Sequence, residues 1–159
     1  MEYSQINNKI YSKAFLRSLF LVQNKWHQHG IFIHTLGVIY YAVLGDGMKF
    51  FAAALLHDVG KPFSAFVKDE EDEKFNEYSF TDHEERSYQI IKNWPFVSQY
   101  TKNIVRYHYL IRDIKKSKTE NLARYVEKKE IWDSLDKDMQ TDLERFLIHD
   151  DRGKGKKKR

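Results

Sequence analysis

Residues 52–62 read Ala-Ala-Ala-Leu-Leu-His-Asp-Val-Gly-Lys-Pro. The segment from Met48 to Asp58 is almost wholly apolar, which predicts a helix at the centre of the fold. Gly60 and Pro62 end this helix, because glycine commonly closes a helix and proline cannot continue one. The pair His57-Asp58 therefore stands at the end of a buried segment, an unusual place for two titratable side chains.

Helical periodicity continues on both sides of this segment, and no stretch shows sustained strand alternation. Thr81 with Glu84, and Ser117 with Glu120, match the capping box that begins many helices. Residues 63–80 are expected to form a loop. The predicted fold is an all-α, single-domain bundle of roughly seven helices, over about 11–25, 30–44, 48–58, 81–93, 96–112, 117–134 and 137–150.

Length and composition agree with one folded domain. The chain has 159 residues, of which 42% are hydrophobic, and this is enough for a core. It has no Cys, which excludes disulfides, thiolate metal sites and cysteine nucleophiles and fits a cytoplasmic setting. Residues 26–45 carry no Asp, Glu, Lys or Arg, but they include His27, His29 and His34, so we expect a buried helix and no membrane span.

The basic charge of the chain comes from its end. The whole chain carries +4, from 27 Lys and Arg against 23 Asp and Glu. Six of those cations lie in residues 152–159, which leaves 21 cations against 23 acids, or −2, in residues 1–151. We therefore expect a folded domain over 1–151 and a disordered basic tail over 152–159. The tail has two open interpretations, a solubilising end or a contact with an RNA backbone.

Several His and Asp side chains interrupt apolar helical positions. Any one of them has an ordinary explanation as a hydrogen-bonded core residue or a solvated helix end. Burying all of them is costly unless something pairs with them, and a divalent metal ion does so. The set consists of His34, His57, Asp58, His83, His108 and Asp150.

The order of these residues resembles the HD superfamily of metal-dependent phosphohydrolases, which runs His, His-Asp, Asp with two further His in members that hold two metals. The segment 78–84 resembles the Phe-x-x-His-Glu segment of the family, and 148–153 resembles its closing Ala-Asp-x-x-Gly segment. The resemblance spans about 30–153. It implies the HD-domain fold and two divalent ions, for which Mn, Fe, Ni, Co and Mg all stay open.

The resemblance also implies roles for single residues. Asp58 would bridge the metals, with His34, His57 and Asp150 completing one site and His83 and His108 holding the other. A hydroxide between the metals would attack the phosphorus. Lys61 would contact a phosphate oxygen, with a surface or helix-end lysine as the alternative. Asp150 is preferred to its neighbour Asp151 as the ligand, by counting back from Gly153.

Other polar residues keep two interpretations each. Glu84 either orients His83 or only caps a helix, and His149 is either a partner of the site or exposed. His27 and His29 are expected at the surface, although either could face the mouth of the pocket. The candidate substrate cations, each with a solvated face as the alternative, are Arg86, Arg112, Arg152 and Lys154.

The substrate is predicted only as a class. Phe63, Phe66 and the segment 83–87 look closest to stand-alone HD units associated with tRNA nucleotidyltransferases and RNA-end repair. This favours a phosphomonoesterase or 2′,3′-cyclic phosphodiesterase that acts on nucleotides or RNA ends, with no partner protein implied. Two alternatives stay open: a di-iron oxygenase with the same ligands, and a non-catalytic nucleotide-binding or interaction module.

Overall fold

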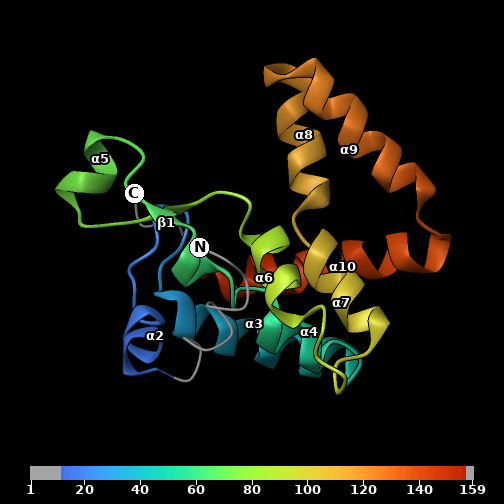
Figure 1. The fold of residues 1–159 in the computed structure, drawn as a ribbon, viewed down its shortest axis with the longest axis horizontal. Helices are drawn as coiled ribbons and strands as arrows, with labels where there is room; N and C mark the ends of the chain where they lie inside the picture. The colour runs from blue at the N-terminus through green and yellow to red at the C-terminus, as the bar shows by residue number, and fades with distance from the viewer. Residues whose placement is uncertain (1–11, 157–159) are drawn as a thin grey trace.

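The computed structural model describes residues 12–156. Helices dominate it, as predicted, and one very small sheet accompanies them (Figure 1). The α-helices are α2 (Lys13–Ser18), α3 (Ile31–Asp46), α4 (Phe51–Leu56), α5 (Glu70–Lys74), α6 (His83–Ile91), α7 (Gln99–Tyr107), α8 (Leu110–Glu120), α9 (Leu122–Ser134) and α10 (Lys137–Gly153). A 3₁₀ turn covers Lys61–Phe63, and the strands are β1 (Ala65–Phe66) and β2 (Ser79–Phe80).

The core lies where α10 crosses α3 and where α4 and α7 pack beside them. Phe50 and Phe146 meet edge to face there, with ring centroids 5.8 Å apart. Apolar side chains from each of these helices surround that pair, and they are almost completely withdrawn from solvent. Phe50, Ala53 and Ala54 of the apolar segment are therefore central, as the sequence predicts, whereas Phe51 and Leu55 of the same segment reach solvent.

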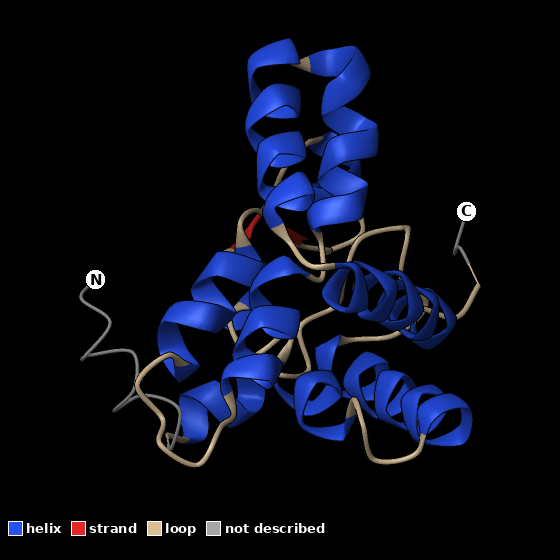
Figure 2. Cartoon of the chain, turned by 90° about the vertical axis from the view of Figure 1, so that its right-hand side faces the viewer, coloured by secondary structure: helices blue, strands red, loops and turns tan. Residues whose placement is uncertain are grey.

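Helices α8 and α9 form a hairpin that stands away from this body (Figure 2). The two helices of the hairpin are linked by Arg124 of α9, which donates to Asp113 of α8 at 2.7 Å. No residue of α9 is buried, so the far helix of the hairpin contributes little to the core. Its near helix, α8, begins directly beside His108 and so connects the hairpin to the polar centre described below.

Two glycines allow unusually close contacts between helices. A Cβ on Gly60 would lie 2.5 Å from the backbone nitrogen of Ser87, and one on Gly153 would lie 2.9 Å from the backbone nitrogen of Val38. Both distances are shorter than any side chain tolerates, so only glycine permits these contacts. The first brings α6 against the end of α4, and the second brings the end of α10 against α3.

The structure corrects several helix boundaries. The first helix ends at Ser18 instead of continuing to about 25, and the helix predicted over 96–112 is divided at His108 and Tyr109 into α7 and α8. The predicted loop 63–80 contains a two-stranded antiparallel sheet, in which Ala65 pairs with Phe80, and the short helix α5.

Neither predicted capping box forms. Asp82 precedes α6 in a left-handed conformation with φ of 51°, and no side chain caps that helix. Ser117 lies inside α8, where its hydroxyl donates to the carbonyl of Asp113, and Asn121 caps α9 instead. At Ser117, the hydrogen bond from the hydroxyl to the backbone of its own helix replaces the predicted cap.

The end of the chain continues the fold beyond the expected boundary. Helix α10 runs through Gly153, and the carbonyl of Lys154 accepts a hydrogen bond from the backbone of Gln28 at 2.9 Å. The boundary expected at 151 therefore falls inside a helix, and the tail prediction for 157–159 lies outside the described residues. Within residues 12–156, no helix has the length and apolar content needed to cross a membrane.

Candidate metal centre

The structure brings the six predicted His and Asp side chains together, although they come from five separate segments. Two groups meet the distance requirement for a metal ion, with ligand atoms within 4.8 Å of one another: His34, His57 and Asp150 in one, and Asp58, His83 and His108 in the other. All six residues are buried. Buried His and Asp oxygen and nitrogen donors without sulfur suit Mn, Fe, Co, Ni or Zn.

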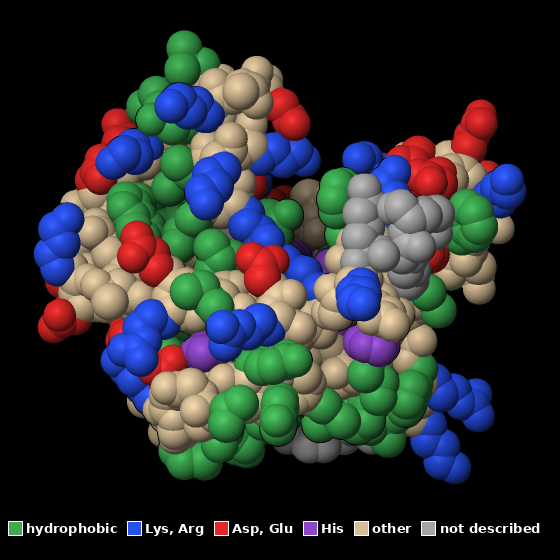
Figure 3. Space-filling view, turned by 180° about the vertical axis from the view of Figure 1, so that it is seen from behind, with side chains coloured by type: hydrophobic (Ala, Val, Ile, Leu, Met, Phe, Trp, Pro, Cys, Tyr) green, Lys and Arg blue, Asp and Glu red, His purple; other side chains and the backbone are tan. Residues whose placement is uncertain are grey.

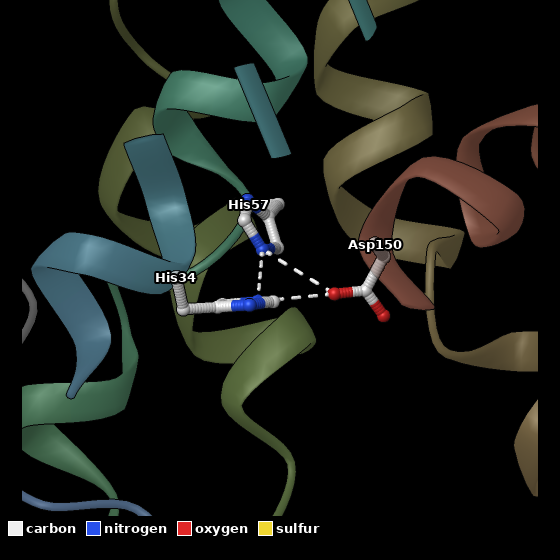
Figure 4. Close-up of side chains that lie close together, drawn as sticks. All are labelled: His34, His57 and Asp150. Atoms are coloured by element: carbon white, nitrogen blue, oxygen red, sulfur yellow. Dashed lines mark hydrogen bonds and ion pairs between the residues drawn. The ribbon is translucent and has the colours of Figure 1, made fainter. Parts of the chain in front are cut away.

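The first group joins three of the four helices that form the core, α3, α4 and α10 (Figure 4). Nε2 of His34 lies 3.1 Å from Oδ1 of Asp150 and 3.3 Å from Nε2 of His57. His57 lies 3.8 Å from the same carboxylate oxygen. These three side chains point toward one another, because α3, the end of α4 and the end of α10 meet at this place.

Asp58 lies between the two groups. Its Oδ2 is 3.3 Å from Nε2 of His34 and 3.2 Å from Nε2 of His57, whereas its Oδ1 is 3.5 Å from Nε2 of His83. One carboxylate therefore turns one oxygen to each group, as a bridging ligand must. On the second side, Nε2 of His83 and Nε2 of His108 are 3.2 Å apart.

Backbone carbonyls determine which ring nitrogens carry a proton. Nδ1 of His57 donates to the carbonyl of Ala54 at 2.8 Å, and Nδ1 of His108 donates to the carbonyl of Val105 at 2.7 Å. A carbonyl can only accept, so in each neutral ring Nε2 carries the lone pair and faces the centre. Oδ1 of Asp58 is also buried and accepts no hydrogen bond within the described chain. These inward-facing donors fit divalent cations, which would satisfy them together.

Burial and mutual charge move the pKa values of the second group in the directions that metal binding requires. Burial lowers the pKa of His108 to about 4 and that of His83 well below its usual range. Burial would raise the pKa of Asp58, but the neighbouring His57 and the Lys61 ammonium hold it well below its usual range. Both His rings are therefore neutral and Asp58 is ionised near neutral pH, the states in which these side chains bind metals.

Lys61 lies at the same centre. Its ammonium nitrogen is 2.7 Å from Oδ2 of Asp58 and donates to the side-chain oxygen of Gln23 at 2.6 Å. It also lies over the ring of Phe80, 5.4 Å from the ring centroid. Lys61 is only 4% exposed, which excludes the surface-lysine interpretation.

A cavity of about 630 Å³ opens onto the metal centre. Its wall includes four of the six candidate ligands, Asp58, His83, His108 and Asp150. It also includes the cations Lys61, Lys68, Arg112, Lys116 and Lys154, and the aromatic side chains of Trp26, Phe80 and Tyr109. Lys and Arg side chains edge the hollow between the α8–α9 hairpin and the rest of the chain (Figure 3). The cavity therefore suits an anion with an apolar or aromatic portion.

The two adjacent acids at the end of α10 have different surroundings. Asp150 is 5% exposed and turns Oδ1 to His34, while its Oδ2 accepts from Arg112 at 2.9 Å. The side chain of Asp151 is 53% exposed and pairs with Arg112 and Lys154 at the cavity rim. Of the two, only Asp150 faces the imidazoles.

Some of the other predicted residues lie at the site, and others lie outside it. Arg112 and Lys154 line the cavity, whereas Arg86 and Arg152 are not among the described residues of its wall. His149 is buried away from the centre, with Nε2 2.6 Å from Asp46, so it joins α10 to α3. Oε2 of Glu84 lies 3.4 Å from Nδ1 of His83, and because the capping box is absent, this contact is the better account of Glu84.

In the segment before α3, sequence reasoning missed Gln23 and Trp26, and it expected His27 at the surface with the mouth of the pocket as the alternative. Gln23 is completely buried and holds Lys61. His27 lies edge-on to His34, with ring centroids 5.2 Å apart, and it lines the cavity together with Trp26. No periodic pattern marks residues 20–30, so only the proximity of polar side chains to the first ligand, His34, could have indicated them.

Comparison with known proteins yields one match. The family model described as HD domain matches residues 31–150, a range that begins at the first residue of α3 and ends at Asp150. The matched range contains all six candidate ligands. No curated protein and no solved structure gives a significant match.

Proposed function

Because this chain belongs to the HD-domain family, we propose that it is a metal-dependent phosphohydrolase that cleaves phosphoesters of nucleotides or RNA ends. One observation carries the proposal: the carbonyls of Ala54 and Val105 fix the rings of His57 and His108 with their lone pairs turned toward Asp58. Imidazole nitrogens that are oriented in this way around a carboxylate are typical of metal ligands, and packing of the core does not require them.

Two cations would be held by the two groups described above, with Asp58 between them. His34, His57 and Asp150 would hold one, and His83 and His108 the other. When bound, such a pair lowers the pKa of water and neutralises phosphate charge. The identity of the metals is open among Mn, Fe, Ni, Co and Mg.

Protein cations would orient the phosphate group. Lys61 projects its ammonium beside Asp58, and Arg112 fixes one oxygen of Asp150 so that the other faces His34. Lys154 adds a charge 3.4 Å from Asp150. These cations favour a substrate that carries a phosphoryl group, since fixed positive charges stabilise developing negative charge on phosphate oxygens.

Aromatic side chains favour a substrate that carries a base. Trp26 is 57% exposed at the cavity, and Tyr109 stands beside His83, with ring centroids 5.4 Å apart. Every nucleobase can stack on such a ring. Lys154 and Gly155, at the beginning of the basic end of the chain, line the cavity, so an RNA end in the cavity would meet the charge of Lys154. We place this activity in the cytoplasm, where such substrates occur.

The test is a hydrolysis screen on the full chain after metal analysis. The substrates are a generic phosphomonoester, nucleotides and 2′,3′-cyclic nucleotides, each with Mn²⁺, Ni²⁺, Co²⁺, Fe²⁺ and Mg²⁺. Asp58→Ala should abolish turnover while the helical circular dichroism signal is kept. Asp151→Asn, an exposed neighbour of the centre, serves as the control and should retain activity. Unchanged turnover in Asp58→Ala would defeat the proposal.

Two further readouts separate the alternatives. Oxygen consumption by the iron-loaded protein without phosphate release would assign it to the oxygenases. Nucleotide binding without any turnover would make it a binding module. For RNA ends, a chain that stops after Gly153 should process oligonucleotides more weakly than the full chain, and the difference should shrink as salt is raised. Equal rates at low and moderate salt would remove the tail from the proposal.

A further inference from the structure

Helix α3 is apolar on both of its sides. One side enters the core through Val38 and Ala42, which are completely buried. The other side carries large apolar side chains that reach solvent, among them Tyr40 at 62% exposed and Leu44 at 70%. A helix that is apolar all round is normally covered on all sides, so the outer side of α3 lacks a cover within the described chain.

The exposed apolar side chains of α3 lie on one side of the helix, because they are spaced by three, four and seven positions. Met48 and helix α4, which packs against α3, add further exposed apolar side chains. Hydrophobic side chains gather along this edge of the molecule in Figure 3. We call this surface the α3–α4 face; it consists of Phe32, Ile33, Leu36, Tyr40, Val43, Leu44, Met48, Phe51 and Leu55.

The size of the α3–α4 face matches a stable dimer interface. Its side chains are 36–70% exposed. With about 200 Å² for a fully exposed large side chain, the face offers about 900 Å² per protomer. Contiguous apolar patches on monomers seldom exceed a few hundred Å², and a standard interface buries about 800 Å² on each partner.

The charge pattern identifies the partner. Residues 31–45 contain no Asp, Glu, Lys or Arg. In a twofold-symmetric dimer, the same surface faces itself, so any charge near the axis would meet its own copy and repel it. A lipid surface would instead require a basic polar side along the helix, and the opposite side of α3 is core.

We infer that the α3–α4 face is the interface of a homodimer, in which α3 packs against α3 of a second copy. The inference is independent of the proposed function. None of the residues of this face lines the 630 Å³ cavity, so both cavities stay open in the dimer. His34 points inward from the same helix, and the dimer would therefore cover the outer side of an element that carries a candidate ligand.

The test is the mass of the full chain in solution, measured by sedimentation equilibrium. The expected species is twice the protomer mass of 19.1 kDa. Leu44→Glu should weaken the dimer by about 100-fold or more, because it sets like charges opposite each other across the interface. Leu122→Glu, on α9, is the matched control, since Leu122 is equally exposed at 71% but lies outside the face, and it should stay dimeric.

A second measurement does not depend on how Leu44→Glu folds. The chain has no Cys, so Leu36→Cys and Leu122→Cys each carry a single thiol. A short bis-maleimide should link two copies of Leu36→Cys and should not link Leu122→Cys.

Four outcomes would overturn the inference: a monomer at all concentrations, a Leu44→Glu variant that remains dimeric, failure of Leu36→Cys to cross-link, or a monomer that binds phosphatidylglycerol vesicles through this face. A monomer whose Leu36→Cys thiol resists labelling would instead assign the cover to residues 1–11.

Discussion

The ammonium nitrogen of Lys61 lies 2.7 Å from Oδ2 of Asp58, and both side chains are almost completely buried. Gln23 fixes the lysine by accepting a hydrogen bond from it at 2.6 Å. A buried ion pair is costly to break, because the remaining charge has no water to solvate it. Lys61 therefore has two effects at once: it stabilises the ionised form of Asp58, and it supplies a positive charge to the cavity.

Lys61→Met separates these two effects. Without metal, the variant should lose about 3–5 kcal/mol of unfolding free energy, because Asp58 is left as an uncompensated buried charge. Saturating Mn²⁺ should recover most of this loss, since a cation then faces the same carboxylate. Urea unfolding with and without Mn²⁺ measures both quantities. The control is Lys68→Met, an exposed lysine of the cavity wall, and it should change stability little.

Hydrolysis should respond to Lys61→Met even when stability is recovered. Removing one charged donor to a phosphate oxygen typically slows turnover by about 100-fold. We expect that loss in kcat at saturating Mn²⁺, with the bound metal content unchanged. If Lys61→Met hydrolyses the best substrate of the screen at the rate of the original chain, Lys61 is only a structural partner of Asp58.

Metal removal should destabilise the fold. The two groups of ligands join α3, α4, α6, α7 and α10, so a cation bound only by the folded chain stabilises all of these contacts together. Mn²⁺ at 100 times its dissociation constant should add about 2.7 kcal/mol, and a chelator should remove this gain. Thermal unfolding in the two conditions gives the comparison. A Tm that changes neither with Mn²⁺ nor with chelator would contradict the metal centre.

Asp150 and Asp151 should differ sharply although they are neighbours. Asp150→Asn removes the carboxylate that faces His34, so the bound metal should fall by about one ion per chain when two are held. Asp151→Asn changes only the pairs of an exposed carboxylate with Arg112 and Lys154 and should leave the metal content intact, since exposed pairs contribute about 0–1 kcal/mol. Plasma emission spectrometry of the two dialysed variants decides between them, and the reverse pattern would assign the ligand to Asp151.

The sequence predicts which six side chains come together, because each stands out locally. His34, His57 and His108 interrupt apolar helical positions, and a polar ring at such a position requires a buried partner. Gln23 and His27 give no such signal, since they precede α3 in a segment without periodicity and enter the site only when that segment folds back beside Tyr78. Arg86 shows the opposite error: it lies near His83 in sequence, but the described cavity wall does not include it.

Helix boundaries are also predicted only where the local sequence carries the signal. The long helices α3 and α10 lie close to their predicted ranges, because α3 is a long uninterrupted apolar segment and α10 has helical apolar periodicity. The capping signals at Thr81 and Ser117 depend on the backbone conformation at single residues. Tertiary contacts determine that conformation, and the local sequence does not. Ser87 illustrates the point: its hydroxyl donates to the carbonyl of His57 and accepts from the amide of Gly60, which places α6 against the His-Asp pair regardless of how α6 is capped.

Gly153 should prove essential for the position of Asp150. A Cβ at this position would lie 2.5 Å from Cγ2 of Val38 and 2.9 Å from its backbone nitrogen, so Gly153→Ala must push the end of α10 away from α3. We expect a loss of about 1–3 kcal/mol of unfolding free energy from overpacking, together with weaker Mn²⁺ binding, because Asp150 stands three residues before the glycine.

Val38→Ala removes one of the two contacts, so Gly153→Ala should cost less unfolding free energy when it is combined with Val38→Ala than alone. This reduction in cost should be incomplete, since the contact with the backbone nitrogen of Val38 remains. Urea unfolding of the four chains in this double-mutant cycle measures the coupling, and strictly additive losses would show that the end of α10 is not held by this contact.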